Sequence, residues 1–273
     1  AGVPHIIHSI HGPSFGPFQG WATNALFRGA ERFAGRMTDH FVTVADAMRD
    51  QYLAAGISQA NDYTRIPSGF DLQPFLDAEN SPTKRASLGL SPGDFVVGKI
   101  ARLFELKGHD DLFAIAPRLA RRIPNIRFLL VGDGVWRGRF ERLAKEIGCS
   151  QNFIFTGLVP PSEIPSLVGV MDALVHLSRR EGLPRALPQA MAAAKPVVAF
   201  DCDGAGEVCL DGKTGHLIEP GDLPKLEERL AKLANDAPLR TALGQAGRKV
   251  VEEEFTVEQL VERQYELYKR LLA

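Results

Sequence analysis

The sequence contains few cysteines and no long apolar run. Of its 273 residues only three are cysteines, Cys149, Cys202 and Cys209. Their number is odd and their spacing is not that of metal ligands, so we expect reduced thiols and a cytoplasmic location. No apolar stretch approaches the ~20 residues that cross a bilayer. The N-terminal stretch AGVPHIIHSIHG has no methionine and no features of a signal peptide.

An excess of charge of either sign is also missing. The chain has 32 Lys and Arg residues against 33 Asp and Glu, a formal net charge of −1. Because no Lys/Arg run occurs, we expect no nucleic-acid partner. A hydrophobic content of 45% and a charged content of 24% are ordinary for a globular protein. The length allows one large domain or two smaller ones, with a sizeable core.

From residue 70 onward, short apolar runs alternate with amphipathic segments. Strands are expected at Phe95–Ala101, Ile126–Val131, Asn152–Thr156, Ala173–Leu177, Val197–Phe200 and Gly215–Ile218. Helices are expected between most of them, at His109–Arg122, Trp136–Ile147, Ser162–Val170 and Leu187–Ala194. This alternation predicts an α/β fold with a Rossmann-like, doubly wound parallel sheet covered on both faces. Ligands of such sheets bind outside the carboxyl ends of the strands.

The first 69 residues and the end of the chain carry fewer elements. Strands are expected at His5–Ile10, His40–Ala45 and Tyr63–Ile66. One helix is expected at Trp21–Arg36, with Trp21 and Phe33 on one side, and another after Asp46, which we expect to be its cap. The turn-rich segment Pro67–Phe75 is a hinge candidate, and three closing helices begin near Pro224, Pro238 and Val257.

The stretch Glu181 to Phe200, EGLPRALPQAMAAAKPVVAF, joins an acidic residue to a Gly-x-Pro turn, an Ala-rich helix and a buried strand. A helix that begins near Leu187 would direct its free backbone N–H groups toward the turn, where they attract anions. Pro188 fits the first turn of this helix. Glu181 and Gln189 flank this end, so the stretch indicates an anion site between two hydrogen-bonding side chains.

Two cations follow the first strand of the alternating region, in ARLFELKG. The guanidinium fork of Arg102 and the mobile ammonium of Lys107 could together hold a diphosphate. Taken alone, they are better explained as surface cations near Glu105 and Asp110. In the same way, Glu181 could be a solvated carboxylate paired with the arginines at 179 and 180.

The Gly132-Asp133-Gly134 turn lacks the third glycine of a dinucleotide fingerprint, since Arg137 stands in its place. We therefore expect no nicotinamide cofactor. A tight turn between strand and helix is the plain explanation of the segment, and direct contact with another ligand is the alternative.

Several of these segments together resemble family 4 retaining glycosyltransferases of the GT-B fold, the group 1 glycosyltransferases. That family has an acidic residue, seven residues, a second acidic residue, and then an A-M-A-x-G-K-P-V-V-A run, which Glu181 to Ala199 resembles. The sequence departs from it at Gln189, where the family has glutamate, and at Ala194, where glycine is usual. Ala101 to Gly108 resembles the family segment G-R-L-x-x-x-K-G, with Ala101 in place of glycine.

The resemblance implies a role for each candidate residue. Arg102 and Lys107 would hold the diphosphate of a donor, Glu181 would bind hydroxyls of the donor sugar, and Gln189 would meet the ribose. The remaining implied contacts come from the backbone at Gly182, Leu183, Pro184 and Arg185 on the diphosphate, from Gly132 and Leu158 near the nucleotide, and from His11 near the donor sugar. Glu207 matches a family turn in which glutamate is mostly structural. The catalytic residues implied in this way are Glu181, Arg102, Lys107 and His11.

The implied activity is transfer of a sugar from a UDP- or GDP-linked donor to a glycan, lipid-linked or small-molecule acceptor. The family retains the α configuration and uses no essential metal, so we expect no metal site and no cofactor. Two alternatives stay open. One is a nucleotide-sugar-binding module without transfer activity, which Gln189 favours, and the other is a sugar-nucleotide epimerase, which would need further carboxylates in the cleft.

The resemblance also divides the chain into three parts. Residues 70–255 resemble the complete nucleotide-sugar-binding half, residues 1–69 only the last part of the acceptor half, and residues 256–273 a helix that returns to it. We therefore expect a truncated product whose strand at His5–Ile10 has an open edge and no neighbour. A second copy or a missing N-terminal piece would then cover this region, and peripheral contact with a membrane is a further expectation.

Overall fold

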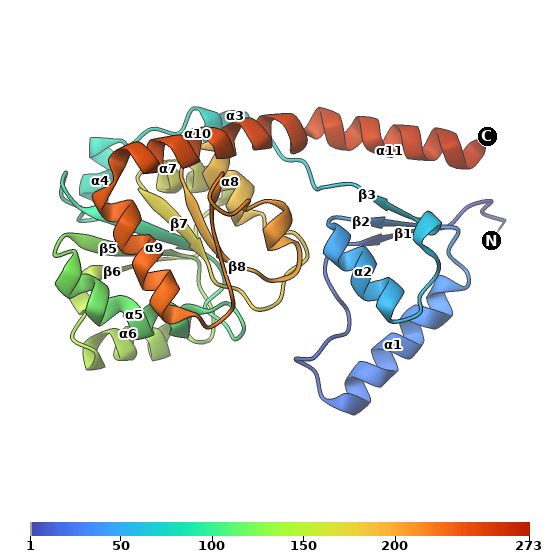
Figure 1. Cartoon of the computed structure of the whole chain (residues 1–273), viewed down its shortest axis with the longest axis horizontal. Helices are drawn as coiled ribbons and strands as arrows, with labels where there is room; N and C mark the ends of the chain where they lie inside the picture. Colours follow the sequence, from blue (N-terminus) through green and yellow to red (C-terminus); the bar gives the residue numbers. More distant parts are fainter. Residues whose placement is uncertain (1) are drawn as a thin grey trace.

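The computed structural model describes residues 2–273, which form two lobes built on separate parallel sheets (Figure 1). The smaller lobe contains the three-stranded sheet β1-β2-β3, and the larger contains a six-stranded sheet in the order β6-β5-β4-β7-β8-β9. The strands of the larger sheet are β4 Phe95–Ile100, β5 Ile126–Val131, β6 Phe153–Gly157, β7 Ala173–His176, β8 Val197–Phe200 and β9 Gly215–Ile218. The prediction of a doubly wound α/β fold is confirmed.

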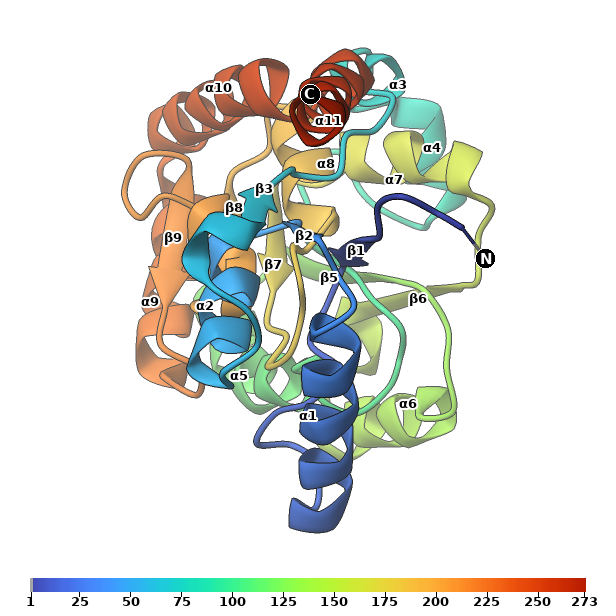
Figure 2. The same ribbon diagram turned by 90° about the vertical axis from the view of Figure 1, so that its right-hand side faces the viewer.

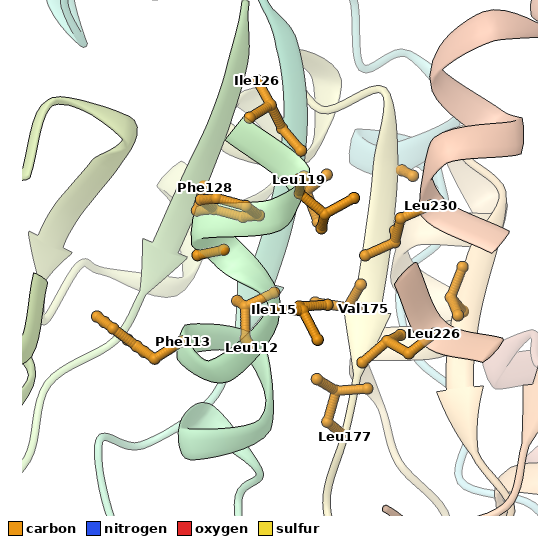
Figure 3. Close-up of a cluster of buried hydrophobic side chains, with 14 of the residues drawn as sticks. Leu112, Phe113, Ile115, Leu119, Ile126, Phe128, Val175, Leu177, Leu226 and Leu230 are labelled. Atoms are coloured by element: carbon orange, nitrogen blue, oxygen red, sulfur yellow. The ribbon is translucent and has the colours of Figure 1, made fainter. Parts of the chain in front are cut away.

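Helices cover both faces of the large sheet because its strands are apolar on both sides. One buried cluster lies under α5 (His109–Arg122), α6 (Arg137–Glu146) and α9 (Leu223–Asn235), and Figure 3 shows Leu112 and Leu226 meeting Val175 there. The opposite cluster lies under α3 (Gln73–Leu76), α7 (Ile164–Gly169), α8 (Ala186–Ala192) and α10 (Ala237–Glu254). The sequence analysis missed α3 and the neighbouring α4 (Pro82–Ser87), which are each too short for a clear apolar period.

The smaller lobe has one sheet and two α-helices within residues 2–69. Its strands are β1 Ile7–Ile10, β2 His40–Thr43 and β3 Tyr63–Arg65, and its helices are α1 Trp21–Gly35 and α2 Asp46–Ala54. β1 pairs in parallel with β2, so the expectation that it has no neighbour is wrong, although its other edge carries no strand among the described residues.

The helix expected at Trp21–Arg36 is present as α1, but it buries no residue, and the side chains of Trp21 and Phe33 are 86% and 64% exposed. One further expectation for this lobe is wrong. Asp46 is not a cap but the first residue of α2, and the preceding Ala45 offers no side-chain cap.

The last helix, α11 (Val257–Leu272), returns from the large lobe to the smaller one, as Figures 1 and 2 show. Leu267 is buried against Val42 of β2 and Ile66, and Arg270 donates a hydrogen bond to Thr64 at 3.0 Å. Among residues 2–273, no helix is both long and apolar enough to span a bilayer. All three cysteines are free, as predicted.

Candidate functional site

The candidate residues gather at the point where the strand order of the large sheet reverses. β4 and β7 are neighbours there, with Gly98 opposite Leu174. β4 leads into the loop of Arg102 and Lys107, and β7 leads into the loop of Glu181. Since the carboxyl ends of parallel strands meet at one edge, residues 74 positions apart come into contact.

Two adjoining cavities open at this edge. A cavity of ≈ 570 Å³ is lined by Arg102, Lys107, Glu181, Leu183, Pro184, Arg185 and Gln189, together with His176. A second, of ≈ 360 Å³, shares Arg102, Lys107 and Glu181 and adds Gly182 and, from the smaller lobe, His11. Their volumes are in the range of small-molecule sites, and the second connects both lobes.

The two cations of the β4 loop are held differently. The ammonium of Lys107 donates a hydrogen bond to Oε1 of Glu181 at 2.6 Å, whereas Arg102 is exposed and forms no ion pair among the described residues. Its guanidinium lies 5.9 Å from the ring centroid of Phe104. Asp110 pairs with Arg139 instead, so neither cation is neutralised by the acidic neighbours considered from the sequence.

The two arginines that precede Glu181 do not pair with it. Arg179 donates two hydrogen bonds to Asp111, at 2.8 and 3.0 Å, and Arg180 donates to the carbonyl oxygen of Pro13 at 2.5 Å. Arg180 therefore links the Glu181 loop to the smaller lobe, and the carboxylate of Glu181 turns toward the cavities.

Burial and charge decide the ionisation of the groups around Glu181. Burial lowers the pKa of His176 to about 3, so this ring is neutral near pH 7 although its Nε2 lies 3.6 Å from Glu181. Burial alone would raise the pKa of Glu181, but the hydrogen bond and the charge of the Lys107 ammonium hold it below its usual value. Because His176 is neutral, Lys107 is the effective charge, and Glu181 is an ionised acceptor for hydrogen bonds.

A close approach of two backbones fixes the Glu181 loop against the smaller lobe. A Cβ atom on Gly182 would lie 2.0 Å from the carbonyl oxygen of His11, so only glycine fits there. α8 begins one residue earlier than expected, at Ala186, and no side chain caps it. Gln189 lies on this helix, and its side chain makes no hydrogen bond within the described part of the chain.

Gly132 and Leu158 line neither cavity. Gly132 has a φ of +131°, and a Cβ atom there would lie 2.3 Å from the carbonyl oxygen of Ala101, which makes this glycine a packing requirement of the Arg102 loop. Leu158 directly follows β6 and is 85% exposed. Their proposed contacts with the nucleotide stay predictions.

Sequence reasoning missed three residues near Glu181. His176 and Lys99 are buried within strands that read as ordinary apolar runs. Asp203 accepts a hydrogen bond from the backbone N–H of Glu181 at 2.7 Å. The signal for Asp203 was available, because it belongs to an Asp-x-Asp tripeptide, Asp201-Cys202-Asp203, directly after β8. Within residues 2–273, however, no group of three His, Cys, Asp or Glu side chains is placed to hold a metal ion.

Comparison with known proteins shows which proteins this chain resembles. The chain is 31% identical over 259 residues to a GDP-mannose-dependent alpha-(1-6)-phosphatidylinositol monomannoside mannosyltransferase of Mycolicibacterium smegmatis, an alignment covering 91% of the chain and 65% of that relative. It is 28% identical to 2-deoxystreptamine glucosyltransferase of Streptomyces kanamyceticus, with 99% of the chain and 72% of the relative covered. The chain thus spans about two thirds of the length of these relatives.

Solved structures give the same result. The Anabaena protein HepE in complex with UDP-glucose superposes with a TM-score of 0.85 at 25% identity, covering 97% of this chain and 72% of HepE. Residues 80–250, which hold every candidate residue except His11, match the family described as glycosyl transferases group 1. The chain belongs to the group 1 glycosyltransferases.

Proposed function

We propose that this chain binds a nucleotide-diphosphate sugar, UDP- or GDP-linked, and transfers the sugar to an acceptor with retention of configuration. The observation that carries the proposal is the convergence of Arg102, Lys107, Glu181 and Gln189 on one cavity of ≈ 570 Å³ at the strand-order reversal. These side chains offer two cations, one ionised acceptor and one amide. That set suits a diphosphate flanked by a sugar and a ribose.

The chemical task in such a transfer is to stabilise the charge that develops on the departing diphosphate. Arg102 is free to meet it, and the Lys107 ammonium, with three N–H donors, could bind the diphosphate while it keeps its hydrogen bond to Glu181. The turn from Gly182 to Arg185, which precedes α8, would add backbone N–H groups. The two cations and this turn supply positive charge from the protein itself, and we propose that the reaction needs no metal or cofactor.

Glu181 would bind hydroxyls of the donor sugar rather than transfer a proton. Its carboxylate is held ionised beside Lys107, so it is an acceptor at neutral pH. His11 enters the adjoining cavity from the smaller lobe, on the side from which an acceptor would arrive. A sugar-containing or lipid-linked acceptor is proposed because the relative from Mycolicibacterium smegmatis is named for a phosphatidylinositol mannoside.

A second candidate function is binding of a nucleotide sugar without transfer, which the amide at Gln189 favours. One experiment separates the two. Titration calorimetry with UDP-glucose and GDP-mannose measures binding, and a parallel assay measures release of UDP or GDP in the presence of acceptors. Binding with release supports transfer, binding without release supports the binding module, and no binding of either donor contradicts both.

A further inference from the structure

The turn Asp203–Glu207, a single 3-10 segment between β8 and β9, contacts both the Glu181 loop and the smaller lobe. Its first residue bonds to the loop and its last residue bonds to α2 of the other lobe. Neither Asp203 nor Glu207 lines the two cavities.

At its first end, the turn holds the backbone of the Glu181 loop. Oδ2 of Asp203 accepts the N–H of Glu181 at 2.7 Å, and the next N–H, from Gly204, donates to the carbonyl oxygen of Gly182 at 3.0 Å. Asp203 has a φ of +49°, a left-handed conformation that costs free energy in a residue with a Cβ atom. A glycine would avoid this strain but would lack the carboxylate that accepts the N–H of Glu181. This hydrogen bond explains why an aspartate stands at this position.

At its last end, the turn caps a helix of the smaller lobe. The carboxylate of Glu207 accepts the N–H groups of Asp46 at 3.0 Å and Ala47 at 2.9 Å, the first two residues of α2. It also accepts from Nε of Arg65, at the end of β3, at 2.8 Å. α2 has no cap of its own, so Glu207 supplies across the lobes what an N-cap residue normally supplies locally.

Between these ends the turn is tightly packed against both lobes. A Cβ atom on Gly204 would lie 2.6 Å from the carbonyl oxygen of Gly182 and 2.7 Å from Cβ of Ala45, the residue before α2. The Glu181 loop and the start of α2 therefore press on the same residue from two sides. A displacement of the smaller lobe has to move the turn, and the turn has to move Glu181.

We propose that the turn Asp203–Glu207 couples the relative position of the two lobes to the position of Glu181, with Asp203 and Glu207 as positioning residues. The inference rests on the proposed role of Glu181 in binding the donor sugar. Coupling between two sites is reciprocal. Loosening Glu207 from α2 weakens binding of the sugar, and binding of the sugar favours the bridged arrangement of the lobes.

The test measures donor affinity in variants that leave the cavities untouched. Glu207→Gln is titrated with UDP-glucose and GDP-mannose and, separately, with UDP and GDP. We expect at least a fivefold loss of affinity for the sugar nucleotide that the parent prefers, the lower end of typical coupling, and less than a twofold change for the free diphosphate. Glu254→Gln is the matched control, because Glu254 lies 3.7 Å from the same Arg65 but forms no hydrogen bond or ion pair with α2 or the turn within the described part of the chain.

A double-mutant cycle tests whether the two ends act through one element. Asp203→Gly relieves the left-handed strain while it removes the acceptor for Glu181, so we expect an unchanged or higher Tm with weaker sugar-nucleotide binding. In Asp203→Gly/Glu207→Gln, the combined loss should be no larger than the greater single loss, because both changes interrupt the same connection. If Glu207→Gln does not fold, Asp46→Pro replaces it in the binding measurements. This variant removes one N–H group that donates to Glu207, and proline is compatible with the first position of a helix.

Three results overturn the coupling. They are sugar-nucleotide affinity equal to the parent in folded Glu207→Gln or Asp46→Pro, equal losses for the sugar nucleotide and the free diphosphate, and fully additive losses in the double variant. If the parent binds neither sugar nucleotides nor free diphosphates, the proposed function fails and the coupling fails with it. If the parent binds the sugar nucleotide and the variants bind it equally well, the coupling is wrong and the proposed function stands.

Discussion

Arg102 and Lys107 hold the same charge in different surroundings, and both are expected to act on the leaving diphosphate. Replacing either by alanine should lower kcat/KM by about 30- to 900-fold, which corresponds to about 2–4 kcal/mol of transition-state stabilisation. Steady-state kinetics with the donor that the parent uses measures this loss. Arg122→Ala, an exposed cation at the far end of α5, is the control for net charge.

The two variants also remove different contacts of the resting protein. Lys107→Ala removes the partner of Glu181 as well as a diphosphate contact, whereas Arg102→Ala removes only the latter. Turnover and binding equal to the parent in both variants would show that the diphosphate lies elsewhere.

Gln189 lines the cavity at a position where the resemblance to the family predicts glutamate. A carboxylate accepts from both vicinal ribose hydroxyls, whereas the amide nitrogen only donates. Gln189→Glu should therefore tighten binding of UDP or GDP by about 1–2 kcal/mol, measured by calorimetry, with no change in the Tm of the unliganded protein. Equal or weaker binding would mean that this position does not meet the ribose.

At the scale of elements, β4 carries an unusual buried cation. Lys99 is 1% exposed, and its ammonium forms no ion pair among residues 2–273. Burial lowers its pKa to about 7, although Glu181 and Asp111 oppose the shift. In the unfolded chain the pKa of a lysine is near its usual value of about 10.4, so the unfolded state binds the proton more tightly.

The sign of the resulting pH dependence follows from this difference. Below pH ~7 both states are protonated and the full cost of burying the charge is present, and the cost disappears as pH rises toward ~10. Lys99→Met should thus raise the Tm most at pH 6–7, with a gain that shrinks at higher pH. Thermal melts across this range check it, and a gain independent of pH would contradict it.

At the scale of the whole molecule, the two lobes are in contact at Gly182, where there is no room for a side chain. Gly182→Ala should force the Glu181 loop away from His11, since the new Cβ atom would lie 2.0 Å from the His11 carbonyl oxygen. We expect a larger radius of gyration in X-ray scattering and a loss of sugar-nucleotide binding. Gly138→Ala on α6, where a Cβ atom would be 3.6 Å from the nearest atom, is the control. An unchanged radius with normal binding would show that the loop can relax locally.

The sequence by itself determined the large lobe and the loops that carry its site. Short apolar runs bounded by turn residues, such as Val197–Phe200 after Pro196, are typical of buried strands, and amphipathic segments such as His109–Arg122 cover them. Once the sheet is parallel, the residues after each strand share one edge, so Arg102, Lys107 and Glu181 are all expected at that edge. The expectation that they form one site came from the resemblance to the family.

Only the tertiary structure decided which groups bond to one another. Lys107, rather than Arg179 or Arg180, pairs with Glu181 because β4 and β7 are neighbours, and no local pattern encodes that adjacency. The same holds for Glu207, whose partners on α2 lie about 160 residues earlier in the chain. Local periodicity reports on neighbours within a few residues, whereas these contacts depend on strand order and on how the two lobes pack.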